Sequence, residues 1–227
     1  MLNLKLKALA NEIHDRNLRR KVVDLLENPT FEVGGERFSG AAFEVSPAGL
    51  SHHHCYAGGY VEHVVSTASL ALALCDCVER VYHGKVNSDI VVAAVLLHDV
   101  FKPATYASRR LADFLDHQSL IVAELVRRGF SLEVVHAVAA AHGEYGLIRP
   151  HSVEALVCHL ADFVDSRLNG EVLDAASFLM RKAVGQELFG LTSKEAFEII
   201  QAKSVEGEDG VRKAFKKMKR ARETHKT

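Results

Sequence analysis

The sequence has little of what marks a secreted, membrane-bound or strongly charged protein. Its 227 residues contain no tryptophan, and a formal net charge of −1 gives no global attraction to nucleic acid or acidic membranes. Residues 1–7 are typical of the start of an amphipathic helix rather than of a signal peptide. We expect that no apolar run reaches the roughly 18 to 20 residues that cross a bilayer. We therefore expect a cytoplasmic protein with no membrane partner.

The chain also lacks a disulfide framework. Its four cysteines are Cys55, Cys75, Cys77 and Cys158. Cys75 and Cys77 lie two residues apart in a predicted helix and point to different sides, which disfavours a mutual disulfide. A C-x-C metal site is the alternative, but no second cysteine pair follows. Buried free thiols in a reducing compartment are the preferred interpretation.

The hydrophobic pattern predicts an all-α helical bundle. With 48% hydrophobic and 25% charged residues, the composition is ordinary for a globular protein, and 227 residues require only one domain. Residues 31–45, broken by Gly34-Gly35, are compatible with a short β-hairpin. The predicted helices cover 3–28, ended by Pro29; 60–82; 90–101, capped by Asn87-Ser88 and ended before Pro103; 107–128, ended by Gly129; 131–142, capped by Ser131 and ended by Gly143; 152–168, capped by Ser152 and ended near Gly170; and a helix opened by the capping box Thr192-x-x-Glu195.

The carboxyl-terminal residues are strongly basic. The basic side chains are Arg212, Lys213, Lys216, Lys217, Lys219, Arg220, Arg222 and Lys226, against one acid, Glu223. An apolar stripe at helical spacing runs through Val211, Ala214, Phe215, Met218 and Ala221. Two interpretations stay open: a helix docked by this stripe with a solvated basic face, or a surface that contacts a nucleic-acid backbone.

The strongest chemical signal is the pair His98-Asp99 at the end of the apolar run 90–97. Burying an imidazole and a carboxylate there costs several kcal/mol unless a partner such as a metal ion holds both. His14-Asp15, in contrast, lies in a polar stretch and is expected to face water.

Four more polar residues interrupt apolar segments elsewhere: His63, His117, His142 and Asp162. A single one of these would more often be a hydrogen-bonded core residue. Because several separate helices each contribute one or two, a shared site is the better explanation.

The order His63, His98-Asp99, Asp162 resembles the H…HD…D signature of the HD-domain metal-dependent phosphohydrolase superfamily, and His117 and His142 are similar to the extra histidines of its binuclear branch. Residues 97–102 resemble the HDxxK segment of that superfamily, and residues 159–165 resemble its terminal H-x-A-D-x-x-D. The resemblance implies an HD-type bundle with its core at 45–170, preceded by a helix and hairpin at 1–44 and followed by carboxyl-terminal helices at 171–227, in one compact domain.

A second resemblance is to YhaM-type 3′→5′ exoribonucleases. It rests on His52-His53-His54 followed by Gly58-Gly59, and on His142-Gly143-Glu144. The β-barrel nucleic-acid module that precedes the HD domain in those enzymes has no evident counterpart before residue 45, and Ala141 stands where they usually have a second histidine.

The resemblance implies two metal ions. His63, His98, Asp99 and Asp162 would hold one ion, and Asp99 would bridge to a second ion held by His117 and His142. Mixed imidazole and carboxylate ligands suit Mn²⁺, Fe²⁺, Co²⁺ or Zn²⁺ better than Mg²⁺.

Further residues have expected roles around the ions. Asp99, Lys102 and Asp165 are the candidate catalytic residues: Lys102 would neutralise phosphoryl charge, and Asp165 would orient a histidine or act as a general acid or base. His159 is another candidate for orienting a ligand. The candidate substrate-binding residues are Lys102, His53, His54 and Glu144.

The expected function is metal-dependent hydrolysis of phosphoester bonds in nucleotides or at oligonucleotide ends by a metal-activated water. The alternatives are a regulatory nucleotide-binding HD module without turnover and a purely structural helical protein. A homo-oligomer is compatible with all three.

Overall fold

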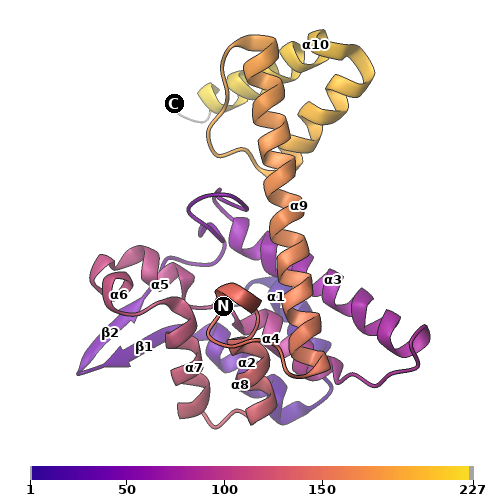
Figure 1. Ribbon diagram of the computed structural model, residues 1–227. Coiled ribbons are helices and arrows are strands. Elements are labelled where there is room, and N and C mark those ends of the chain that lie inside the picture. Colours follow the sequence, from indigo (N-terminus) through magenta and orange to yellow (C-terminus); the bar gives the residue numbers. More distant parts are fainter. Residues whose placement is uncertain (1, 225–227) are drawn as a thin grey trace.

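The computed structural model describes residues 2–224 and confirms a helical architecture with one small hairpin in that range (Figure 1). The basic residue Lys226 lies outside the described residues. The elements are α1 (Leu4–Asn11), α2 (Arg16–Glu27), β1 (Thr30–Val33), β2 (Glu36–Ser39), α3 (Gly59–Arg80), α4 (Ser88–Leu97), α5 (Lys102–Ala107), α6 (Arg109–Phe114), α7 (His117–Arg127), α8 (Leu132–Ala139), η1 (Gly143–Tyr145), α9 (Val153–Val184) and α10 (Ser193–Thr224). The hairpin pairs β1 with β2 in antiparallel register and turns at Gly34-Gly35 as expected.

Helix α4 is the centre of the main core. Asn87 caps it by accepting hydrogen bonds from the backbone N–H groups of Asp89 and Ile90, and every residue from Val91 to Leu97 is buried. It packs against α3, α8 and α9. This environment explains why the helix is apolar all round.

Our expectation that no apolar run is long enough to cross a membrane is wrong when helices are judged by their length and composition alone. Gly59–Arg80 and Ser88–Ala107 are both long and apolar enough to cross a membrane. In the second stretch, 72% of an apolar 18-residue segment is buried inside the protein. Packing in a protein core therefore accounts for that stretch, since nearly all of α4 is buried in the larger cluster of apolar side chains.

Several predicted helix ends differ from the structure. The first helix is two helices, because Asp15 accepts hydrogen bonds from the N–H groups of Asn17 and Leu18 and starts α2. Residues 98–101 form a turn, and Pro103 lies in the first turn of α5 instead of ending α4. Proline is tolerated there because the first N–H groups of a helix have no partner within the helix. The predicted 107–128 helix breaks into α6 and α7, with Asp116 capping α7.

Helix α9 does not end near Gly170 but continues to Val184. A Cβ atom at Gly170 would lie 3.2 Å from the carbonyl oxygen of His52, so glycine there lets the 52–54 loop approach the helix. Beyond α9, the capping box forms: the Thr192 N–H donates to Glu195, and the Glu195 N–H donates to the Thr192 hydroxyl.

The structure has two hydrophobic clusters, joined by α9. The larger one is built around α4, and the smaller one lies between the far part of α9 and α10 (Figure 1). Non-helical geometry at Gly207 (φ 65°, ψ −144°) folds α10 back on itself. The division of the chain at residues 44 and 170 stays a prediction.

The carboxyl-terminal stripe packs into the smaller cluster through Val211, Ala214, Phe215 and Met218. Several basic residues of this helix pair within the protein. Lys217 Nζ lies 2.6 Å from Glu198, and an Arg222 nitrogen lies 2.9 Å from Glu195. Arg212 and Lys213 also have acidic partners. Nucleic-acid contact through this helix stays a prediction.

All four cysteines are free thiols, but our expectation that they are buried is only partly correct. Cys75 and Cys158 are buried and Cys77 is partly buried, whereas Cys55 is exposed.

Candidate metal centre

The structure brings together the six candidate ligands from separate elements. His63 lies in the first turns of α3, and His98 and Asp99 follow directly after α4. The others come from the first position of α7, the residue before η1 and the buried face of α9; they are His117, His142 and Asp162. The isolated pair His14-Asp15 is exposed at the surface, as expected.

Asp99 lies between two pairs of imidazoles. Its Oδ2 atom is 3.4 Å from Nε2 of His63 and 3.4 Å from Nε2 of His98. Its Oδ1 atom is 3.4 Å from Nε2 of His117 and 3.3 Å from Nε2 of His142. Each oxygen of one carboxylate therefore faces a different histidine pair, which is the arrangement a bridging ligand requires.

Asp162 contributes to both pairs. Its Oδ1 atom is 3.3 Å from Nε2 of His63 and 3.5 Å from Nε2 of His98, completing the first ligand set. Its Oδ2 atom accepts a hydrogen bond of 2.9 Å from Nδ1 of His142. This bond leaves Nε2 of His142 facing Asp99.

Hydrogen bonds on their other ring nitrogens orient two more imidazoles. His98 Nδ1 donates to the carbonyl oxygen of Val95 at 2.8 Å, and His63 Nδ1 donates to Asp165 Oδ2 at 2.7 Å. Asp165 in turn accepts a hydrogen bond from the Ser66 hydroxyl. Metal-bound histidines usually have such a partner, because it fixes the tautomer and the ring direction. In this geometry Asp165 orients His63.

The donor set fits a divalent cation. Asp99 is fully buried, yet within residues 2–224 neither of its oxygens has a hydrogen-bonding partner of acceptable geometry. Lys102 Nζ is 2.6 Å from Oδ2 and provides an ion pair on one side only. A buried carboxylate in this state is costly without more positive charge. Imidazole and carboxylate donors together suit a transition metal.

The pKa directions show the same demand for positive charge. Burial disfavours protonated His142, but the carboxylates of Asp162 and Asp99 outweigh it and raise its pKa to about 9. Burial likewise opposes protonation of His63, and its carboxylate neighbours raise its pKa well above the usual value. Protons and cations compete for this cluster, since a metal ligand must be a deprotonated imidazole.

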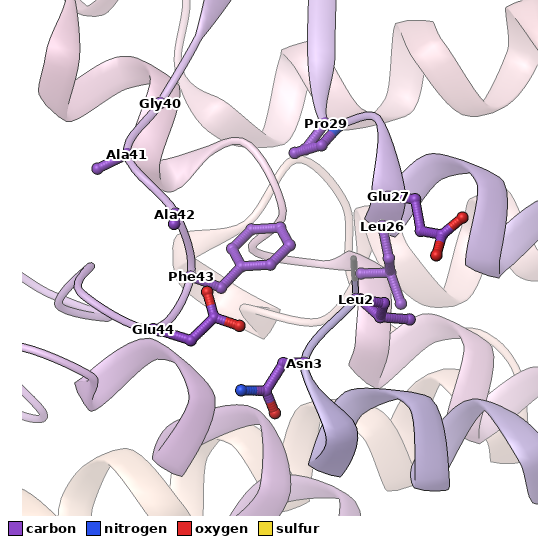
Figure 2. A pocket seen from close by; sticks show the side chains of 10 residues that line it. All are labelled: Leu2, Asn3, Leu26, Glu27, Pro29, Gly40, Ala41, Ala42, Phe43 and Glu44. Carbon is purple, nitrogen blue, oxygen red and sulfur yellow. The ribbon is translucent and has the colours of Figure 1, made fainter.

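A cavity of about 240 Å³ opens beside the cluster. It is lined by His53, Lys102, Gln118, His142, Tyr145, His159, Asp162, Phe163 and Ser166. Figure 2 shows a different cavity, of about 170 Å³, between the start of α1, the end of α2 and residues 40–44. This second cavity has no histidine or lysine among its lining residues, so we assign the site to the 240 Å³ cavity beside the metal-ligand cluster.

The candidate substrate-binding residues occupy different positions. His53 is half-buried and lines the cavity, where burial lowers its pKa to about 4. His54 is buried with Nδ1 3.7 Å from Asp165 Oδ2, and it does not line the cavity. Glu144 is exposed in η1 and does not line it either. The binding roles of these residues stay predictions.

Gly143 lets His159 pack against the segment that carries His142. It has a φ of +54°, and a Cβ atom there would lie 2.1 Å from Cε1 of the His159 ring. His159 Nδ1 donates to the carbonyl oxygen of Ala141 at 3.0 Å. This packing holds the His142 segment against α9.

Sequence reasoning missed several residues of the site. Gln118, Tyr145, Phe163 and Ser166 line the cavity, and Asn169 bonds to the backbone of His54. Only the spacing of Ser166 and Asn169 from Asp162 on one helix offered a signal for any of these positions.

Comparison with known proteins gives four informative similarities. The HD domain profile matches residues 60–167. The chain is 41% identical over 172 residues to the dihydroneopterin 2′,3′-cyclic phosphate phosphodiesterase of Methanocaldococcus jannaschii, covering 73% of this chain and 69% of that protein. It is 30% identical over 146 residues to the 3′-5′ exoribonuclease YhaM of Bacillus subtilis, covering 57% of this chain and 45% of the exoribonuclease. The exoribonuclease YhaM of Listeria monocytogenes is 32% identical over 140 residues, with 54% and 43% covered. No solved structure matches the chain.

Proposed function

Because this chain belongs to the HD domain family, we propose that it is a metal-dependent phosphohydrolase that cleaves phosphoester bonds of a nucleotide-like substrate. The observation that carries the proposal is the buried Asp99, whose two oxygens face two separate histidine pairs. The chain spans less than half of the exoribonucleases it matches but 69% of the cyclic phosphodiesterase. We therefore favour a small cyclic phosphodiester over an RNA end.

The proposed ions are two transition-metal cations, Mn²⁺, Fe²⁺, Co²⁺ or Zn²⁺. When bound, they supply Lewis acidity that lowers the pKa of water and neutralises charge on phosphate oxygens. Hydrolysis adds water across one P–O bond and yields a phosphomonoester and a free hydroxyl group.

Lys102 and His53 are the two polar residues of the cavity to which we assign contact with the substrate. Burial opposes the charge of Lys102, but the carboxylates of Asp99 and Asp162 outweigh it and raise the pKa of Lys102, which keeps it cationic. It lines the cavity and adds positive charge where the phosphoryl oxygens would lie. His53 is neutral at pH 7 and offers a hydrogen bond to the ester.

Two exposed aromatic side chains in the same cavity support a substrate with a planar ring. Tyr145 is 86% exposed and Phe163 is 53% exposed, although both line the site. Aromatic faces open to solvent in a cavity are suited to stacking on a heterocycle. Gln118, beside Tyr145, carries an amide that can bond to the edge of such a ring.

The test is hydrolysis by the purified protein with added Mn²⁺. Adenosine 2′,3′-cyclic phosphate is compared with glycerol 1,2-cyclic phosphate, which has no ring to stack, and with a 5′-labelled oligoribonucleotide. We expect ring opening of both cyclic esters, with the adenosine compound preferred, and loss of both activities in Asp99→Asn.

Three other results would contradict parts of the proposal. Release of 5′-mononucleotides from the oligonucleotide alone would establish an exoribonuclease. Recovery of an intact bound nucleotide after long incubation would favour the regulatory module without turnover. Equal rates for the two cyclic esters would remove the argument for ring stacking.

A further inference from the structure

A buried chain of hydrogen bonds joins α9 and α10 to the loop that carries the histidine run. The backbone N–H of His54 donates to Asn169 Oδ1 at 2.7 Å. Asn169 Nδ2 donates to Ser193 Oγ at 2.7 Å, and Ser193 Oγ pairs with the Tyr56 hydroxyl at 2.5 Å. Asn169, Ser193 and Tyr56 are all buried. The first residue of α10 is thus linked to the loop at two points.

The loop needs this support because its backbone is unfavourable. His52 and His54 have φ angles of 76° and 45°, a region that residues other than glycine rarely adopt. Such conformations persist only where the surrounding structure holds them. The carbonyl oxygen of His54 accepts from the N–H of Ala48 within the same segment, so the bond from its N–H to Asn169 is what ties the backbone of His54 to the helical bundle.

Asn169 shares a face of α9 with two residues of the metal centre. Asp162, Asp165 and Asn169 are spaced three and four residues apart and are all buried. The first lies against His63 and His98, the second holds His63, and the third holds the backbone of His54. One helix face therefore fixes both the ligands and the loop next to them.

We propose that Asn169, itself held by Ser193, is a positioning residue that sets where His53 stands in the cavity. In this arrangement α10 acts as scaffold for the active-site loop. The expected effect on kcat rests on the proposed function, because it assumes that His53 contacts the substrate. The structural consequence, that the loop depends on Asn169 and Ser193, does not.

The experiment compares Asn169→Leu and Ser193→Ala with Met180→Ala in the full chain. Asn169→Leu keeps the volume and removes both hydrogen bonds. Ser193→Ala keeps the bond between Asn169 and His54 and removes the two bonds made by the Ser193 hydroxyl, to Asn169 and to Tyr56. Met180 is fully buried in the smaller cluster, which also contains Tyr56, and Met180→Ala weakens that cluster while keeping every group of the hydrogen-bond chain. The measurements are hydrogen exchange of the peptide covering residues 50–58, bound Mn²⁺ per chain, kcat and KM for adenosine 2′,3′-cyclic phosphate, and melting temperature.

We expect roughly tenfold faster exchange of the loop peptide in Asn169→Leu, and a smaller increase in Ser193→Ala. In Asn169→Leu, kcat should fall by about 10- to 100-fold with unchanged Mn²⁺ content, since the loop supplies none of the six ligands. Met180→Ala should lower the melting temperature and leave exchange and kcat unchanged well below it.

Unchanged loop exchange in both Asn169→Leu and Ser193→Ala would overturn the proposal. So would an equal loss of kcat in Met180→Ala, because the effect would then be one of general stability. If the wild-type protein hydrolyses no phosphodiester, the proposed function fails on that result alone, and the exchange measurement still decides whether Asn169 holds the loop.

Discussion

Replacing Asp99 by asparagine tests whether one carboxylate serves two ions. Asparagine keeps the shape of the side chain but offers one neutral oxygen and an N–H₂ group, which cannot ligate. Because each oxygen of Asp99 faces a different histidine pair, the substitution should weaken both ion sites together.

The expected size follows from linkage. An ion held at 100 times its dissociation constant stabilises the folded state by about 2.7 kcal/mol, so two ions contribute roughly 5 kcal/mol. For a chain of this size, 1 kcal/mol shifts the melting temperature by about 2 to 4 °C. Chelation should therefore lower the melting temperature of the wild-type protein by roughly 10 to 20 °C and that of Asp99→Asn by far less. Without ions the two proteins should melt close together, since asparagine removes a buried charge.

The assay is a pair of melting curves, with Mn²⁺ and with chelator, together with elemental analysis of bound metal. Asp89→Asn is the matched control. Asp89 lies on α4 and accepts hydrogen bonds from the backbone N–H groups of His14 and Asp15, outside the metal centre. It should lose stability to the same extent with and without metal. Two ions bound to Asp99→Asn, or a wild-type protein indifferent to chelator, would refute the bridging role.

Three more predictions follow from the same site. Lys102→Met should lower kcat by about 100-fold in steady-state assays at unchanged metal content; lost metal would instead make Lys102 part of the ion site. Gly143→Ala should cost about 1 to 3 kcal/mol of unfolding free energy in urea titrations, because of its positive φ and the nearby His159 ring; an unchanged midpoint would contradict that packing. In the chelated protein, the raised pKa of His142, about 9, contributes stability that is complete below pH 6.5 and lost between about pH 6.5 and 9. The melting temperature of the chelated protein should fall across that range, whereas the affinity for Mn²⁺ should rise as His142 loses its proton.

Local signals in the sequence predicted much of the fold. Asn87, Ser131, Ser152 and Thr192 each precede an apolar periodic segment, and each caps a helix in the structure. Capping depends only on a side chain and the next few N–H groups, so it is readable from short stretches of sequence.

The helix ends predicted from Pro103 and Gly170 were wrong, because tertiary contacts determine the backbone geometry at both residues. Pro103 ends helical geometry at the residue before it, but it equally suits the first turn of a new helix. Gly170 weakens a helix by about 1 kcal/mol relative to alanine. Here the helix continues, because its far half packs in a second hydrophobic cluster and the His52 carbonyl needs the space. The residues that surround Pro103 and Gly170 in the fold are not their neighbours in the sequence, so short stretches of sequence do not show these environments.

The candidate site was also predicted only in part. The six polar interruptions of apolar segments could be selected from sequence, and the structure brings all of them together. Tyr145 and Phe163 could not, because exposure within a cavity depends on the assembled fold. For Asn169 the sequence offered only its spacing from Asp162, since its bond to a residue 115 positions away also depends on the assembled fold.

The continuity of α9 has a consequence for how the protein melts. At 32 residues it is a rod about 48 Å long that is shared by both hydrophobic clusters. Neither cluster can unfold completely without unwinding part of α9, and unwinding α9 from one end destabilises the cluster at the other end. The two halves should behave as one cooperative unit in calorimetry, giving a single heat-absorption peak despite their separation in space.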